Sequence, residues 1–250
     1  MTIIRDTSIL LGRTMKHVFR SLDTIMTVAI TPIAMMLLFV YVFGGAIKVG
    51  TANYVNYLLP GILVIAIASG ISYTAFRIFI DMQKGILTRF NSMPISRSAI
   101  LWAHVLTSMV SNTISMAVIV AVALLMGFRS NANVWEWLGV TGILLLLTFA
   151  LTWLAVIPGL KAKTVGGASA FSYPLIFLPF ISSAFVPTDT MPTVVRVFAE
   201  NQPVTSIVDA IRALLNSGTV GNSLWIALAW CVGITVLAYI FAVRMYKKIA

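Results

Sequence analysis

The chain of 250 residues is 60% hydrophobic and only 10% charged. A soluble domain has about a quarter of its residues charged, so most of this surface must face lipid, and a soluble enzyme is excluded. The chain carries 17 basic and 7 acidic residues, but the basic residues lie between apolar runs, where they set topology and contact lipid headgroups. We therefore expect membrane lipid as a partner and no nucleic acid.

Residues 1–22 predict an amphipathic helix on the cytoplasmic surface of the membrane. Apolar and basic side chains alternate there at helical spacing, which turns the basic face toward the headgroups. The segment has no compact apolar core, so it does not have the pattern of a cleavable signal peptide. The positions that carry the alternation are Ile9, Leu10, Arg13, Lys16 and Arg20.

Six long apolar runs predict six transmembrane helices, because about 20 apolar residues span the hydrocarbon core. Pro174 and Pro179 predict kinks in the fifth run. Tyr54 and Tyr57 lie at the start of the second run, where aromatic residues anchor helix ends at the interface. The runs cover about residues 24–43, 57–80, 98–126, 137–158, 165–186 and 223–243 of a membrane domain at 23–248.

The distribution of Lys and Arg predicts the orientation of the chain. With the N-terminus inside, 13 of the 17 basic residues fall in inner segments, as the positive-inside rule requires. Only Lys48, Arg129, Arg196 and Arg212 fall in outer segments. We therefore expect a multi-pass protein of the cell membrane with both termini in the cytoplasm.

The sequence lacks the motifs of common catalytic and metal sites. Neither the phosphate-binding motif G-x-x-x-x-G-K-[ST] nor the metal motif H-E-x-x-H is present, and the two histidines are isolated. We predict no catalytic residue, no metal site and no cofactor bound by this chain, which is therefore not an enzyme by itself. Ser169 has a small-residue setting that fits an intramembrane nucleophile but is more typical of helix packing. The small neighbours are Gly166, Gly167, Ala168 and Ala170.

The positions of the acidic residues argue against a carrier that is driven by an ion gradient. All seven lie at helix ends or in loops, whereas a proton- or sodium-coupled carrier usually needs a carboxylate or a histidine near the bilayer centre. Only His104 comes near such a position, and we interpret it as an interfacial or inter-helix hydrogen-bonding residue. Energy for transport is then expected to enter through a cytoplasmic loop.

The cytoplasmic segment 81–97 has the pattern of a short amphipathic helix. Its apolar residues recur at three- and four-residue intervals until Pro94 ends the pattern. Arg77 and Asp81, four residues apart, are expected to pair at the preceding helix end. Such a helix suits docking into a groove on a cytoplasmic partner, but a turn on the membrane surface with its Leu and Phe in lipid fits equally. The apolar residues are Ile86, Leu87, Phe90 and Met93.

Two motifs of this chain occur in a known order. The first is an R-x-x-x-P-[IV]-S-R-like pattern after the second membrane helix, formed by Lys84, Gly85, Arg89, Phe90, Met93, Pro94, Ile95, Ser96 and Arg97. This pattern resembles the cytoplasmic loop of ABC-2 type permeases, in particular the daunorubicin-resistance type of drug exporter. The second comprises residues 185–192 and 201–212, which are similar to the family's proline-rich outer loop and the short helices before its last span. Gln202 stands between an Asn and a Pro that the family usually has side by side.

The resemblance covers nearly the whole chain and implies the ABC-2 permease fold of a type V exporter. This fold is an all-α membrane domain with six transmembrane helices and an N-terminal amphipathic helix. Two permease chains, identical or related, would form the pathway, and an ABC ATP-binding subunit that holds ATP and Mg would dock below each one. The segment 81–97 would be the coupling helix. Its implied coupling residues are Asp81, Lys84, Gly85, Arg89, Phe90, Met93, Pro94, Ser96 and Arg97.

The same resemblance implies an outer gate in residues 187–222, built from short re-entrant helices. Its expected residues are Pro187, Pro192, Pro203, Asp209 and Arg212. Asp209 and Arg212 are three residues apart and are expected to pair. The implied function is export of a drug-like, lipid or other amphiphilic substrate, driven by ATP that the separate subunit hydrolyses. The alternative is a membrane protein outside the ABC class, either a secondary carrier or a scaffold.

Overall fold

The computed structural model describes residues 7, 11–12, 22–45, 54–86, 97–216, 218 and 221–249. Most of the predicted amphipathic helix at 1–22, and residues 87–96 of the predicted coupling helix, lie outside these residues. Every regular element in the described part is a helix, as the all-α prediction expects. In chain order these are α2 (Leu22–Leu38), η1 (Phe39–Phe43), α3 (Tyr54–Gln83), α5 (Arg97–Leu125), α6 (Val134–Lys161), α7 (Val165–Ala170), α8 (Ser172–Phe177), η2 (Leu178–Ile181), η3 (Thr188–Thr190), α9 (Thr193–Asn201), α10 (Pro203–Leu215) and α11 (Asn222–Ile249).

Four helices of the described part are long and apolar enough to cross a membrane: α3, α5, α6 and α11. They correspond to the second, third, fourth and sixth predicted spans. The first and fifth predicted spans appear as shorter apolar helical stretches, Ala29–Phe43 and Val165–Ile181. The first includes the π-helix η1, and the fifth is divided among α7, α8 and η2.

The prolines explain why the fifth stretch is divided. A proline has no N–H to donate within a helix and is therefore best tolerated in a first turn. Pro174 lies in the first turn of α8, and Pro179 lies at the start of η2. The predicted kinks are thus confirmed as two restarts of the helix.

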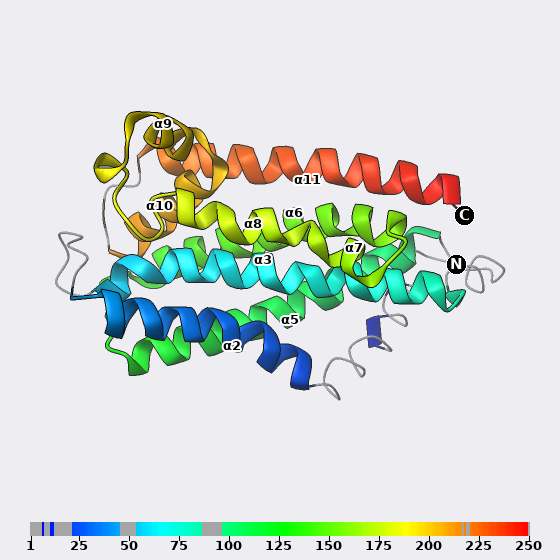
Figure 1. Cartoon of the computed structure of the whole chain (residues 1–250), viewed down its shortest axis with the longest axis horizontal. Coiled ribbons are helices and arrows are strands. Elements are labelled where there is room, and N and C mark those ends of the chain that lie inside the picture. The colour runs from blue at the N-terminus through cyan, green and yellow to red at the C-terminus, as the bar shows by residue number, and fades with distance from the viewer. Residues whose placement is uncertain are drawn as a thin grey trace.

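The four long helices and the two shorter apolar stretches lie side by side, and in chain order they alternate in direction (Figure 1). Helices α3, α6 and α11 all finish at one end of the bundle (Figure 1). We call it the basic end, because Lys84, Lys161, Lys163 and Arg244 lie at or just beyond these helix ends. The opposite end carries α9 and α10 and is called the α9–α10 end (Figure 1).

Helix α3 is the centre of the bundle. It contacts α2, α5, α6, α7, α8 and α10, and most of its residues are buried. A helix that is apolar on all sides belongs in a protein core or in a membrane, and α3 is covered by other helices over most of its surface. Helix α11 differs, because it packs on α6 and α10 and leaves an apolar face exposed that includes Trp225, Leu237 and Phe241.

Close packing between α3 and α5 depends on Gly70. A Cβ added at this position would overlap Asn112 Oδ1 of α5. We expect Gly70→Ala to lower the free energy of unfolding by about 1–3 kcal/mol, because overpacking outweighs the better helix propensity of alanine. The control is Gly142→Ala on α6, where an added Cβ would meet no atom within 4 Å. This variant should unfold with a slightly higher free energy, because alanine favours the helix more than glycine does. Denaturation of the purified protein in detergent measures the free energy of unfolding of both variants. Equal values for the two variants would contradict the close contact between Gly70 and Asn112.

Candidate functional site

The gate prolines predicted from the sequence all lie at helix boundaries at the α9–α10 end. Pro187 precedes η3, Pro192 precedes α9, and Pro203 is the first residue of α10. Pro203 suits the first helical turn, because its fixed φ matches the helix and its missing N–H costs nothing there. Pro187 and Pro192 are the N-cap residues of η3 and α9. The short helices predicted between residues 187 and 222 are therefore present, and the prolines define where they start.

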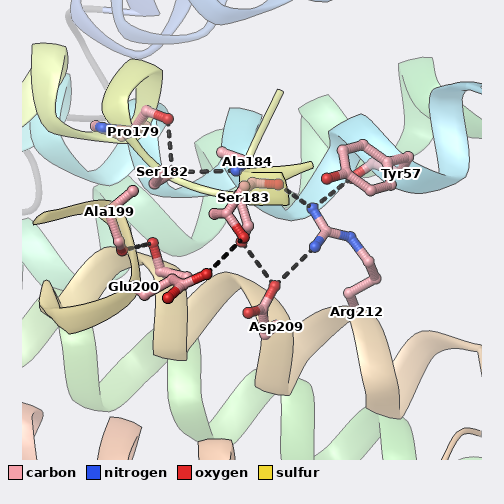
Figure 2. Close-up of polar contacts among 11 residues, drawn as sticks. Tyr57, Pro179, Ser182, Ser183, Ala184, Ala199, Glu200, Asp209 and Arg212 are labelled. Carbon is pink, nitrogen blue, oxygen red and sulfur yellow. Dashed lines mark hydrogen bonds and ion pairs between the residues drawn. The ribbon is translucent and has the colours of Figure 1, made fainter. Parts of the chain in front are cut away.

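Arg212 of α10 is the centre of a polar cluster at this end (Figure 2). Its Nη1 donates a hydrogen bond of 2.8 Å to Asp209 Oδ1, which confirms the predicted pair. Its Nη2 donates to two backbone carbonyls, Ser183 O at 2.7 Å and Tyr57 O at 3.2 Å. The guanidinium carbon also lies 3.8 Å from the centre of the Tyr57 ring, a cation–π geometry. Arg212 thereby joins α10 to the start of α3 and to the loop after η2.

Further hydrogen bonds at the same end strengthen this connection. Ser183 Oγ donates to Asp209 Oδ1 at 2.6 Å, so the Asp209 carboxylate accepts from both Ser183 and Arg212 (Figure 2). Tyr54 Oη donates to Phe185 O at 3.0 Å. Tyr54 and Tyr57, predicted only as interfacial anchors, therefore connect the start of α3 to the loop after η2 and to α10. Position alone predicts an aromatic residue at an interface, but not which carbonyl it contacts.

The Arg212–Asp209 pair is buried on one side only. The Arg212 side chain is 15% exposed and the Asp209 side chain is 41% exposed. Burial lowers the pKa of Arg212, and the neighbouring Tyr57 and Asp209 oppose this effect. The guanidinium still remains charged at any physiological pH because its pKa starts so high. The cluster therefore keeps the positive charge of Arg212, and its Asp209 side chain is exposed on the surface.

Gln202 accounts for the departure from the family's Asn-Pro pattern. Its backbone is extended and forms the N-cap position of α10. Its side-chain Nε2 donates to the carbonyl of Ile181, with a longer contact of 3.4 Å to Leu178 O. The extra residue therefore ties the start of α10 to the end of the broken fifth stretch.

Only part of the predicted coupling segment is described, at the basic end. Helix α3 ends at Gln83, and Gly85 follows with φ +64°. This left-handed conformation favours glycine and is a common way to end a helix. Lys84 is exposed in the same turn, and Arg97 begins α5. Arg89, Phe90, Met93, Pro94 and Ser96 lie outside the described residues.

The two helices that flank the coupling segment are joined by a polar contact. His104 Nε2 of α5 lies 3.2 Å from Asp81 Oδ2 of α3, with side chains 6% and 26% exposed. This polar contact joins α5 to α3, so His104 contacts another helix, as the sequence interpretation expected. The expected Arg77–Asp81 pair is wrong, because Asp81 contacts α5 instead and Arg77 Nε donates to Tyr73 O of its own helix at 3.4 Å.

Candidates for catalysis or metal binding were Ser169 and the His, Cys, Asp and Glu residues. Within the described ranges, no group of three His, Cys, Asp or Glu residues is placed to hold a metal ion. Around Ser169 the predicted small-residue packing is confirmed only at Ala168, which is buried, whereas Gly166, Gly167 and Ala170 are exposed. The carbonyl of Ser169 accepts a hydrogen bond from Ser172 Oγ at 2.8 Å.

Comparison with known families assigns the chain. The sequence model of the ABC-2 type transporter family matches residues 5–216. The chain belongs to the ABC-2 type transporter family. The match spans both the segment 81–97 and the α9–α10 end, the two regions in which the sequence resembled this family.

Two relatives show which members of this family the chain resembles. It is 30% identical to the daunorubicin resistance ABC transporter permease protein DrrB1 of Streptomyces coeruleorubidus, over 94% of this chain and 86% of the relative. It is 23% identical to a protein of Mycobacterium tuberculosis named a probable doxorubicin resistance ABC transporter permease protein, DrrC, over 92% of this chain and 83% of that relative. The chain is therefore an ABC transporter permease, similar along most of its length to permeases named for drug resistance.

Proposed function

We propose that this permease exports an amphiphilic, drug-like substrate across the cell membrane, using ATP hydrolysed by a separate ABC ATP-binding subunit that also holds Mg. The observation that carries the proposal is the similarity over 94% of the chain to a daunorubicin resistance permease. The family match favours this function over a secondary carrier or a scaffold. The lack of a phosphate-binding motif in the sequence fits a permease whose ATPase site is on another chain.

The proposed topology has six membrane passes, with both termini in the cytoplasm. The stretches Ala29–Phe43 and Val165–Ile181 would complete the four longer helices, and residues 1–22 would lie on the membrane surface. The alternation of helix directions in Figure 1 supports this arrangement. The basic end would face the cytoplasm, since Lys and Arg are concentrated on that side of a membrane protein.

The segment 81–97 is proposed as the contact with the ATP-binding subunit. Its two ends belong to α3 and α5, which the Asp81–His104 contact holds together. A displacement of the segment by the ATP-binding subunit would therefore reach both helices at once. The α9–α10 end is proposed as the outer gate, in which the Arg212 cluster fixes α10 to α3. A second permease chain, identical or related, would complete the pathway.

The coupling role can be tested directly at the segment. We expect Arg89→Glu and Phe90→Ala to lower substrate-stimulated ATP hydrolysis about five-fold or more, since coupling free energies are typically of this size. Both variants should still insert into the membrane and be recovered with the ATP-binding subunit. The measurement is ATPase activity of the complex in proteoliposomes, with and without daunorubicin as the probe.

The matched control for this test is Arg244→Glu, which reverses the charge of an exposed arginine on α11, outside both the segment 81–97 and the α9–α10 end. Full stimulation in both segment variants would show that 81–97 is not the coupling element. Transport driven by an ion gradient, with no ATPase recovered with the chain, would instead support a secondary carrier.

A further inference from the structure

A groove on the side of the bundle lies between α6 and the broken fifth stretch. Its volume is about 450 Å³, within the usual range of small-molecule sites. Leu154, Ile157 and Pro158 of α6 form one wall. The other wall is formed by Phe171, Pro174 and Leu175. The lining is therefore almost entirely apolar.

The groove follows from the interruption of the fifth stretch. Phe171 forms a turn between α7 and α8, and Pro174 follows in the first turn of α8. A straight helix would place a continuous row of side chains against α6, whereas an interrupted one leaves a gap where its direction changes. Pro174 is exposed, so the gap opens on the surface of the bundle, where a membrane protein meets lipid.

A positive charge lies at one end of this apolar groove. Lys161 is the last residue of α6, lines the groove and is exposed. No carboxylate lies within 4 Å of its ammonium among the side chains that the structure describes. Lys163 follows on the same connector and is also exposed. A lysine in the last turn also offsets the helix dipole, but that role does not require a groove beside it.

We propose that this groove binds an anionic phospholipid of the inner leaflet, with an acyl chain between α6 and α8 and the phosphate at Lys161 and Lys163. The inner-leaflet position rests on the proposed function and its topology, in which the basic end faces the cytoplasm. Basic pockets between membrane helices on this side attract anionic headgroups. The charge also argues against a cationic amphiphile as the occupant, since like charges repel within a screening length.

Lipid binding can be counted by native mass spectrometry of the permease with its ATP-binding subunit, titrated with phosphatidylglycerol or phosphatidylcholine. We expect tighter binding of phosphatidylglycerol, and about five-fold weaker binding for each of Lys161→Gln and Lys163→Gln, because each basic residue near an anionic headgroup contributes about that factor. Leu175→Trp, which fills the groove, should remove the tight site for both lipids. The control is Arg244→Gln, which removes a charge from the same end on a helix that does not line the groove.

Three outcomes would overturn the site. The first is unchanged phosphatidylglycerol binding in Lys161→Gln, and the second is an equal loss in Arg244→Gln, which would mean general surface charge. The third is a Leu175→Trp variant that still binds lipid but forms complexes with a different number of permease chains. That result would mean that a second permease chain, and not a lipid, covers the groove. Leu175→Met, which keeps the volume, should bind as the native protein does. Because these measurements need neither transport nor ATP hydrolysis, a failed coupling test leaves the lipid result interpretable.

Discussion

Arg212→Ala should lower the free energy of unfolding by roughly 3 kcal/mol, because it removes the donor to two buried carbonyls and leaves the Asp209 carboxylate with the Ser183 hydroxyl but without its ionic partner. For a chain of this length, that corresponds to an apparent melting temperature lower by roughly 5–10 °C. Arg212→Lys should recover only part of the loss, since one ammonium cannot reach Asp209, Ser183 O and Tyr57 O with the geometry of the guanidinium. Thermal unfolding in detergent, followed by fluorescence, measures all three proteins.

The chain provides a matched control for this prediction. Arg196 and Glu200 on α9 also form an ion pair, at 2.7 Å, but both side chains are more than 40% exposed. Exposed pairs of this kind contribute little to stability, so Arg196→Ala should leave the melting temperature unchanged. If the two arginine variants were equally stable, Arg212 would not hold the α9–α10 end together.

His104→Leu should reduce the substrate-stimulated ATPase activity of the complex by about five-fold or more, in line with typical coupling free energies. The reason is that Asp81 would lose the partner that holds α3 to α5 beside the coupling segment. Asp81→Asn should be milder, because an amide oxygen still accepts a hydrogen bond from the imidazole. ATPase assays with and without daunorubicin, alongside unstimulated ATPase activity, separate lost coupling from lost assembly.

A double variant tests whether the two residues act through each other. If the contact matters, Asp81→Ala combined with His104→Leu should cost no more stimulation than either change alone. Additive losses would mean that the residues act separately. The substitution Thr141→Ala on α6 serves as a control, because Thr141 is exposed and its hydroxyl donates only within its own helix.

The sequence predicted the parts of the fold that depend on local pattern. Apolar runs of sufficient length identified the long helices, and Pro174 and Pro179 identified the division of the fifth stretch. The Asp209–Arg212 pair followed from their three-residue spacing within a helix. The helix boundaries were less accurate: α3 begins at Tyr54 and α6 continues to Lys161, beyond the limits predicted from hydrophobicity alone.

Contacts between distant parts of the chain could not be predicted in this way. Tyr57 and Arg212 are separated by 155 positions, and their contact exists only because α10 packs against the start of α3. The Arg77–Asp81 prediction failed for the same reason: a suitable spacing permits a pair, but a closer partner on α5 takes it. The capping box that starts α6, formed by Asn133 and Glu136, was visible in the sequence as an Asn followed three residues later by Glu, yet was missed.

The central position of α3 has a mechanical consequence. Its first turn contains Tyr57, held by Arg212, and its last turns contain Asp81, held by His104. These two positions are about 36 Å apart along a helix that rises about 1.5 Å per residue. In the proposed topology, the Asp81 end of α3 faces the cytoplasm and the Tyr57 end lies at the outer gate. A push on the Asp81 end would then be carried to the Tyr57 end by movement of the helix itself, without a relay of small side-chain changes through the bundle.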